Sequence, residues 1–512
     1  MKKLTYITLL IAGLLSNSCT SDFEEMNKSK TASTSISPDY VFTKSLVTGS
    51  GVSYQIYQLN QEITAGAWVQ HWANIASSFR ADNYKPSYED NIYDFYFARA
   101  NFAPLSLNHQ VIKLIQEGDN NPLKLACAKI WNVYLFHLMT DSYGDIPYSE
   151  AFLSSTPKFD AQKSIYEDML KTLDQSITSI KQNNNTETLK RFPAFGNADV
   201  LYKGNLNNWV KFANSLMLRL SMRVSNVDAN LSKQYISKIN PNELVLNNSE
   251  NAIIVAIKAS AAATNEIKNP LGFIYSWNEI RISKNLMDHL DGTNYGGVVD
   301  PRIKQFAQTI NAGAGTTYKG LLNGQNAQNL AANATDFKNN YSNVGPFFNT
   351  QAYDTPIFLL TAAETNFLLA EAALKGFITG TSQTYYENGI KSSMEQFKNS
   401  LTNTPVIADQ EITDYMNATG VKFETSNALK QIITQKWISL YSNPVEAWAE
   451  MRRTGFPKIN PLVENEPGYT EMPRRRSFST AEIKYNLANY NAAVAKMGGD
   501  GQYTKIWWDG GK

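Results

Sequence analysis

Apolar residues that recur every three or four positions are the feature of this sequence that most restricts its fold. Two stretches show the spacing clearly, namely Leu125, Ile130, Trp131, Tyr134, Leu135 and Leu138 in one, and Trp209, Ala213, Leu216, Leu220 and Val224 in the other. An α-helix completes a turn in 3.6 residues, so this spacing places all the apolar side chains on one face. The pattern predicts two amphipathic helices of a buried layer.

Similar periodicity covers most of the chain and predicts an all-α protein. The predicted windows fall into adjacent pairs at 123–182, 206–240, 357–399 and 424–452, on the scale of tetratricopeptide-like repeats of about 34 residues. We therefore expect a tetratricopeptide-like helix-pair scaffold at about 123–240 and 357–452. Besides the two helices described above, helices are predicted at 54–79, 89–117, 160–182, 357–376, 383–399, 424–441, 445–452 and 480–497.

Two stretches lack this periodicity. Residues 241–356 are dense in Gly, Asn, Ala and Thr, with one short helical window near Ser283–Leu290, and residues 453–479 carry four prolines and a run of arginines. Long irregular segments inside a folded domain are often functional. We expect 241–356 to be a loop-rich insertion that forms the ligand-binding region.

The first residues have the pattern of an export signal. Met1–Lys3 is positively charged, and Leu4–Leu15 is apolar but too short to span a bilayer. Cys19 follows, as in a bacterial lipoprotein signal, although Ser16 stands where a Leu is usual. We expect residues 1–18 to be a signal peptide and Cys19 to carry lipid. The alternative is a plain secretory signal cut near Ser18.

The segment after the cysteine is rich in Ser, Thr, Lys and Asn. This composition predicts that 19–39 is a flexible tether and that 40–512 forms a single body. No later segment approaches the length of apolar sequence that a membrane-spanning helix needs. A lipid on Cys19 is then the expected membrane anchor, and Cys127 remains the one other cysteine.

The charges balance, with 47 Lys plus Arg against 46 Asp plus Glu. A nucleic-acid partner is not expected, because such proteins carry an excess of basic residues. Sequence patterns of catalysis are also missing: the four histidines are scattered, and there is no nucleophile elbow, Walker lysine or dinucleotide loop. We expect no metal, no cofactor and no enzymatic activity.

Two acidic residues on one helix could form a catalytic pair, because glycosidases use two carboxylates. Glu364 and Glu371 lie seven residues apart, on one face of an apolar helix. We interpret them as partners of arginines on packed helices, for example Arg219 and Arg223.

An ordered set of motifs resembles the SusD/RagB family of outer-membrane nutrient-binding lipoproteins. The motifs are Thr140–Ala151, Asp199–Asn205 leading into Trp209–Leu216 and Leu218–Arg223, Asp300–Arg302, Ala363–Ala372, Tyr385–Ile390, Trp448–Gly455 and Trp507–Asp509. Together they cover nearly the whole mature chain. The chain departs from the pattern at Asn205, where the family pattern suggests Asp.

The resemblance implies a function. It implies a lipid-anchored, surface-exposed protein of the outer membrane that captures a nutrient, usually a glycan, and delivers it to a TonB-dependent transporter of the SusC type. Two other readings stay open: a surface-anchored glycoside hydrolase or polysaccharide lyase on an α/α scaffold, and a structural adaptor without a ligand.

The candidate ligand site lies within residues 273–281. A sugar binder needs an exposed aromatic plane and side chains that pair several hydroxyl groups. Tyr275, Trp277, Asn278 and Arg281 offer both. As the resemblance places loops near the N-terminal helices on the same face, Tyr84 and Tyr88 are second-rank candidates. The competing interpretation is that Trp277 fills the junction between loop and helix.

Other motif residues are expected to be structural. Trp209, Trp437 and Trp448 sit on helical faces and should be core residues, and Trp507–Trp508 should be a strap packed on the body. The turn Tyr143–Pro147 should end its helix sharply, since Gly144 can adopt a positive φ and Pro147 blocks helix continuation.

Overall fold

The computed structural model of the chain describes residues 36–52, 56–79, 81–97, 103–255, 269–349, 355–396 and 407–512. Helices dominate these residues, and the strands form three antiparallel pairs of short segments. The prediction of an all-α protein is therefore confirmed. The predicted signal peptide, Cys19 and most of the predicted tether lie outside the described residues. No helix within them is long and apolar enough to cross a membrane.

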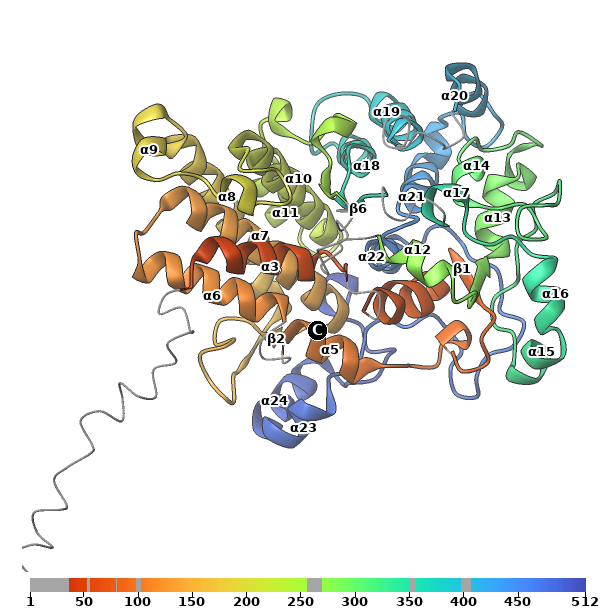
Figure 1. Ribbon diagram of the computed structural model, residues 1–512, viewed down its shortest axis with the longest axis horizontal. Coiled ribbons are helices and arrows are strands. Elements are labelled where there is room, and N and C mark those ends of the chain that lie inside the picture. Colours follow the sequence, from red (N-terminus) through yellow and green to blue (C-terminus); the bar gives the residue numbers. More distant parts are fainter. Residues whose placement is uncertain are drawn as a thin grey trace, which may run out of the picture.

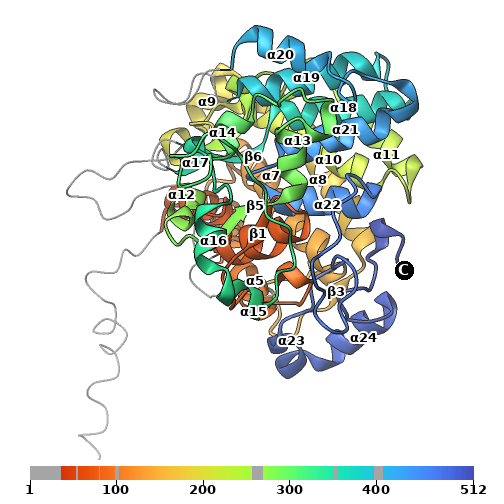
Figure 2. The ribbon, with the colours of Figure 1, turned by 90° about the vertical axis from the view of Figure 1, so that its right-hand side faces the viewer.

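The scaffold is built from helix pairs, as the spacing of the windows predicted. In each pair the two helices pack against one another, and Figures 1 and 2 show the pairs stacked side by side. The pairs are α7 (Pro122–Tyr143) with α8 (Gln162–Asn183), α10 (Leu206–Val224) with α11 (Ala229–Ile236), α18 (Ala362–Leu374) with α19 (Ser382–Glu395), and α21 (Ala428–Ser439) with α22 (Pro444–Thr454).

Helix α7 is the central element of the first half. Its start is fixed by Asn121, which accepts hydrogen bonds from the first backbone amides, and by Pro122 in the first turn. It ends at Gly144, whose φ of 86° is costly for other residues. The expectation of an amphipathic helix was wrong, because α7 is buried on most sides. It is enclosed by α8, α6 (Pro104–Glu117), α3 (Pro38–Gly49) and α10.

Residues 54–79 do not form the single helix that the periodicity predicted. A π-helix, η1, covers Tyr57–Gly66, and the chain then turns at Gln70, whose φ is 55°. Strand β1 (Trp72–Asn74) follows and pairs antiparallel with β5 (Ile280–Ile282). This long-range pairing, which a local pattern cannot reveal, fixes the N-terminal segment against the middle of the chain.

The middle region is more helical than expected. Besides the predicted helix α13 (Lys284–Leu290), it contains α12 (Pro270–Tyr275), α14 (Ile303–Phe306), α15 (Ala327–Ala332), α16 (Ala334–Asn339) and α17 (Pro346–Asn349). These helices are too short for apolar periodicity to show. Figure 1 shows them grouped on the side of the molecule opposite α7 and α8.

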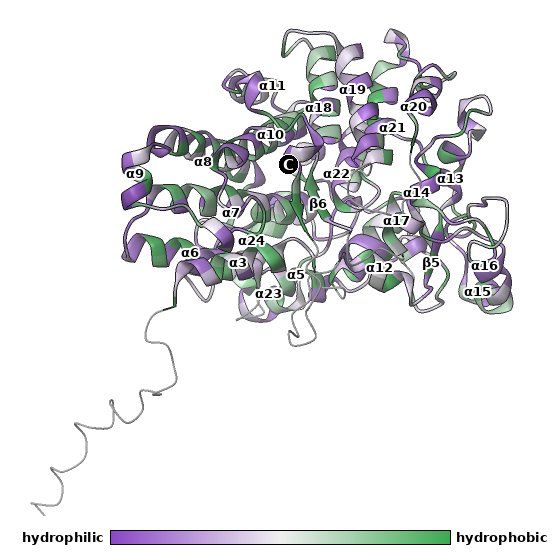
Figure 3. Cartoon of the chain, turned by 45° about the horizontal axis from the view of Figure 1, so that its top comes forward, coloured by the Kyte–Doolittle hydropathy of each residue, from purple (hydrophilic) through white to green (hydrophobic). Residues whose placement is uncertain are grey.

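Shorter elements complete the body. Figure 3 shows apolar β6 in the middle of the molecule and polar α9 at its outer edge. The predicted helix 480–497 is interrupted at Asn486, the cap residue between α23 and α24. These elements are α5 (Glu89–Phe97), β2 (Ile146–Pro147), β3 (Phe159–Asp160), α9 (Thr186–Arg191), β4 (Ala252–Ile254), β6 (Ile357–Leu360), α20 (Asp409–Met416), α23 (Thr480–Tyr485) and α24 (Leu487–Met497).

The tryptophans expected in the core are there. Trp209, Trp437 and Trp448 are each at most 1% exposed. Trp508 is also buried, and its indole N–H donates to Asp141 Oδ1 at 2.8 Å. The C-terminal strap is thus confirmed as a structural element that reaches back to the end of α7.

Candidate functional site

The charged residues of the packed helices form one buried ion network rather than a catalytic pair. Glu364 pairs with Arg219 at 2.7 Å, as expected, whereas Glu371 pairs with Arg453 at 2.5 Å and not with Arg223. Each carboxylate is engaged by a cation, so neither is free to act on a substrate. The network comprises the cations Arg219, Arg223, Lys436 and Arg453 and the carboxylates Asp141, Glu364, Glu371, Glu446 and Glu450.

One corner of this network has metal-ligand atoms. His137, Asp141 and Glu446 each bring an atom within 4.8 Å of the others. Arg223 already binds both carboxylates, at 3.2 Å and 2.6 Å, and Arg219 lies 3.4 Å from His137 Nε2. Burial and these arginines lower the pKa of His137 to about 3. The guanidinium groups therefore occupy the place that a metal ion would need.

A surface cavity of about 320 Å³ brings together three of the predicted ligand residues. We call it the Tyr275 cavity. Its walls come from the end of α12, from β5, from the loop after α14 and from the C-terminal end of α16 with the loop behind it. It is lined by Tyr275, Ser276, Asn278, Arg281, Gln308, Ala312, Lys338, Asn339, Tyr341 and Asn343.

Local backbone geometry positions two of these side chains. Tyr275 ends α12, and its hydroxyl donates to Gln308 Oε1 at 3.3 Å. Asn278 adopts a φ of 58°, a conformation that asparagine tolerates better than most residues. Its Oδ1 accepts from Asn343 Nδ2 at 3.4 Å. These weak contacts leave hydrogen-bonding capacity for hydroxyl groups of a ligand.

Arg281 lies in the wall of the cavity and is almost completely buried. Its guanidinium donates to the backbone carbonyls of Phe337, Ile280 and Lys338. Burial lowers its pKa to about 10, so it stays charged at neutral pH. Arg281 thus holds the end of α16 against β5, and of its five N–H donors it has at most two left for a ligand.

The remaining candidates are not brought to this cavity. Trp277 is 36% exposed and follows α12 directly, next to the lining residues Ser276 and Asn278. Tyr84 is 5% exposed and packs in the core, and Tyr88 is exposed and lies edge-on to Phe79. Neither tyrosine lines the Tyr275 cavity.

The search for aromatic residues with polar neighbours missed half of the cavity. Gln308, Lys338, Tyr341 and Asn343 also line it. Residues 338–343 read Lys-Asn-Asn-Tyr-Ser-Asn, the same mixture of ring and polar groups that marked 273–281. The sequence therefore contained this signal. It did not show that 273–281 and 338–343, about 60 residues apart, come together in the fold.

Comparison with known families settles what kind of protein carries this fold. A sequence model of the SusD-like family, described as SusD and RagB outer membrane lipoprotein, matches residues 21–509. The chain belongs to the SusD/RagB family. The ordered motifs of the sequence are thus family features, and the SusD/RagB fold accounts for the helix pairs.

Solved structures of SusD/RagB proteins agree over nearly the full length. A chitin-binding protein superposes with a TM-score of 0.77 at 26% identity, covering 92% of this chain and 99% of the other. A SusD homologue from Bacteroides uniformis gives 0.75 at 26% identity, with 92% and 99% covered. A chitin-binding SusD homologue from Flavobacterium johnsoniae gives 0.71 at 26% identity, with 92% and 98% covered. No curated protein matches the chain.

Proposed function

We propose that this chain is a lipoprotein exposed at the cell surface that captures an oligosaccharide and delivers it to a TonB-dependent transporter of the SusC type. It does no chemistry on the ligand. Membership of the SusD/RagB family carries the proposal. Two structural relatives whose names state chitin binding favour a glycan as the ligand.

The Tyr275 cavity supports the proposal through its chemistry. Its lining mixes two tyrosines with amide and cationic side chains, and the partly exposed Trp277 lies in sequence between the lining residues Ser276 and Asn278. Aromatic planes stack on the C–H face of a sugar, while amides and cations bond its hydroxyl groups. Its volume of about 320 Å³ is at the lower end for ligand pockets and is enough for a sugar ring.

Binding of sugars to site variants tests the proposal. We expect the soluble body to bind chito-oligosaccharides or another member of a panel of oligosaccharides in calorimetric titration. Trp277→Ala should weaken that binding by about 1–3 kcal/mol, the range for losing an aromatic anchor. Its melting temperature should barely change, because Trp277 is already partly exposed.

Tyr485→Ala is the matched control, since Tyr485 is an exposed ring on α23, outside the cavity. It should bind like the parent protein. A large loss of stability in Trp277→Ala with unchanged affinity would mean that Trp277 fills a structural junction. Release of shorter sugars from any member of the panel would instead support the glycoside hydrolase or lyase.

A further inference from the structure

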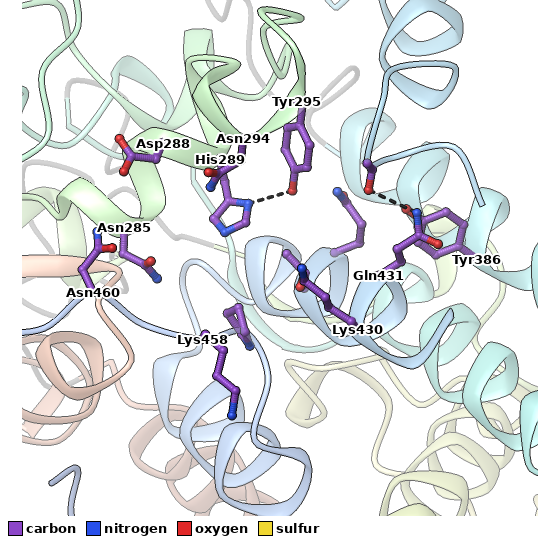
Figure 4. A pocket seen from close by; sticks show the side chains of 14 residues that line it. Asn285, Asp288, His289, Asn294, Tyr295, Tyr386, Lys430, Gln431, Lys458 and Asn460 are labelled. Carbon is purple, nitrogen blue, oxygen red and sulfur yellow. Dashed lines mark hydrogen bonds between the residues drawn. The ribbon is translucent and has the colours of Figure 1, made fainter. Parts of the chain in front are cut away.

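A second cavity, of about 330 Å³, lies between helix α13, helix α21 and the loop that follows α22. We call it the Asn285 cavity; it shares no lining residue with the Tyr275 cavity. Figure 4 shows Asn285 and Asn460 side by side at one end, with His289 in the middle, Lys458 below them and Lys430 toward the other side. None of the ligand residues predicted from the sequence lines it.

Two amide groups in this cavity lack partners. Asn285 is 5% exposed, and its Nδ2 is buried without any hydrogen-bond partner. The Nδ2 of Asn460 is buried and unpartnered as well. A buried donor left unsatisfied costs free energy, so native proteins keep few of them without a reason. Two such donors beside one cavity indicate that a ligand supplies the acceptors.

The neighbouring groups hold these donors in place and add the ring nitrogen of a histidine. Gln70 bonds the backbone of Asn460 in both directions, at 2.7 Å and 2.9 Å, which fixes the position of that residue. The Nδ1 atom of His289 lies 2.7 Å from the Tyr295 hydroxyl. Its Nε2 has no hydrogen-bond partner among the described residues and is free to contact a ligand.

The charge around the cavity is positive. Lys430 and Lys458 line it, and neither forms an ion pair with a carboxylate in the described part of the chain. The one carboxylate in the lining, Asp288, is bound to Lys284 at 2.6 Å. Burial, followed by the charges of Lys430 and Arg302, lowers the pKa of His289 to about 4. The cavity therefore favours a negatively charged occupant.

We propose that the Asn285 cavity binds an oxyanion, a carboxylate or a sulfate, carried by a sugar-sized ligand. Asn285 and Asn460 donate to the anionic oxygens, and Lys430 and Lys458 supply the opposite charge. The volume is at the lower end for ligand pockets, which fits an acidic monosaccharide unit. This site is separate from the Tyr275 cavity, so each can be tested without the other.

Titration of the soluble body with four probes tests the assignment. The probes are D-glucuronate, D-glucose 6-sulfate, D-glucose and sodium sulfate. We expect glucuronate or glucose 6-sulfate to bind at least about tenfold more tightly than glucose, and the tighter of the two identifies the oxyanion. The binding should weaken as salt is added, because exposed lysines are screened.

Site variants locate the binding. Asn285→Leu loses no protein hydrogen bond and should weaken binding of the acidic sugar by at least about tenfold. Lys430→Met should weaken it by about two- to fivefold, as expected for an exposed charge. Lys422→Met is the matched control: this exposed lysine does not line the cavity, and its variant should bind like the parent protein.

Several results would overturn the assignment. If glucose binds as tightly as both acidic sugars, the anion plays no part in recognition. If sodium sulfate binds more tightly than either acidic sugar, the sugar plays no part. Acidic-sugar binding that is unchanged in Asn285→Leu places the site elsewhere. Trp277→Ala should leave acidic-sugar binding intact. The two proposals therefore fail independently: the glycan proposal is tested by the effect of Trp277→Ala, and the oxyanion site by the effect of Asn285→Leu.

Discussion

Buried asparagines in this protein differ in whether their amides are used. Asn108 Nδ2 donates to the Ala128 carbonyl at 2.9 Å, whereas Asn285 Nδ2 has no partner. Both residues are at most 5% exposed. The amide nitrogen is thus satisfied at one position and unsatisfied at the other.

We predict opposite effects when each asparagine is replaced by leucine. Asn285→Leu should raise the free energy of unfolding by about 1 kcal/mol, because an unsatisfied donor is removed. Asn108→Leu should lower it by about 1–3 kcal/mol, because the Ala128 carbonyl loses its donor. Urea denaturation of the two variants measures both changes. A loss of stability in Asn285→Leu would mean that its amide has a partner in solution.

Individual residues show where sequence reasoning reached the site and where it stopped. Tyr275, Asn278 and Arg281 were predicted and do meet at one cavity. The burial of Arg281 could not be foreseen, because its three acceptors are backbone carbonyls, two of them more than 50 residues away. Tyr84 was selected for its ring, and a ring alone does not distinguish core from surface.

At the level of the helices, the buried ion network joins α10 to α18, α21 and α22. Glu446 on α22 accepts from Arg223 on α10 at 2.6 Å and lies 3.7 Å from Lys436 on α21. Arg223, Arg219 and Lys436 lower the pKa of Glu446 from 4.5 to about 2 despite its burial. Its charge is therefore part of what holds the helix pairs together.

We predict that Glu446→Gln lowers the free energy of unfolding by about 3–5 kcal/mol at neutral pH, because it leaves buried cations without their partner. The contribution of Glu446 is complete above its unfolded pKa and is lost as the pH falls from 4.5 toward 2. The difference between parent and variant should accordingly shrink over that range. Urea denaturation at several pH values measures this difference, and a constant gap would contradict the prediction.

The contact between η1 and β1 depends on a single glycine. A Cβ on Gly66 would lie 2.2 Å from the ring of Trp72, which is fully buried in β1. Because β1 pairs with β5, a shift of Trp72 would also reach Arg281 and the Tyr275 cavity.

Gly66→Ala should therefore destabilise the protein by about 1–3 kcal/mol, the usual cost of overpacking, and should weaken sugar binding. Gly501→Ala is the control, since the nearest atom to its added Cβ is 3.9 Å away. Thermal unfolding and sugar titration of both variants decide the matter. Equal melting temperatures would show that the ring of Trp72 can move without cost.

Elements were predictable where their signal is local. The long helices could be predicted because apolar residues recur in them every three or four positions. Their pairing followed from their spacing along the chain. Strand β1 and the short helices α12 and α14–α17 did not, because three to six residues carry no period and their positions depend on partners distant in the sequence. The same limit hid the Asn285 cavity, whose walls come from five separated segments.

For the whole molecule, the proposal makes Cys19 the link between a water-soluble body and the membrane. We predict that Cys19→Ala releases the protein from the outer-membrane fraction, because the lipid is then absent and the formal net charge of +1 gives no electrostatic attachment. Cell fractionation measures this directly. Retention of the Cys19→Ala protein as an intact lipoprotein would contradict it.

The proposed partnership also concerns the whole molecule. A stable pair with a transporter barrel would bury well over about 2,000 Å². Purification of the lipidated protein in mild detergent should therefore recover a barrel protein with it. Recovery of the lipoprotein alone would argue against the transporter.

The C-terminal strap has a consequence for how such a chain is made. Trp508 is synthesised after Arg223, Arg452 and Asp141, yet its ring lies against both guanidinium groups and its indole N–H bonds Asp141 in the interior. The Asp141 corner of the ion network therefore lacks the cover of Trp508 until the C-terminal segment has been synthesised. In the exported lipoprotein that we propose, this order would help secretion, because a chain whose core closes late stays unfolded for longer.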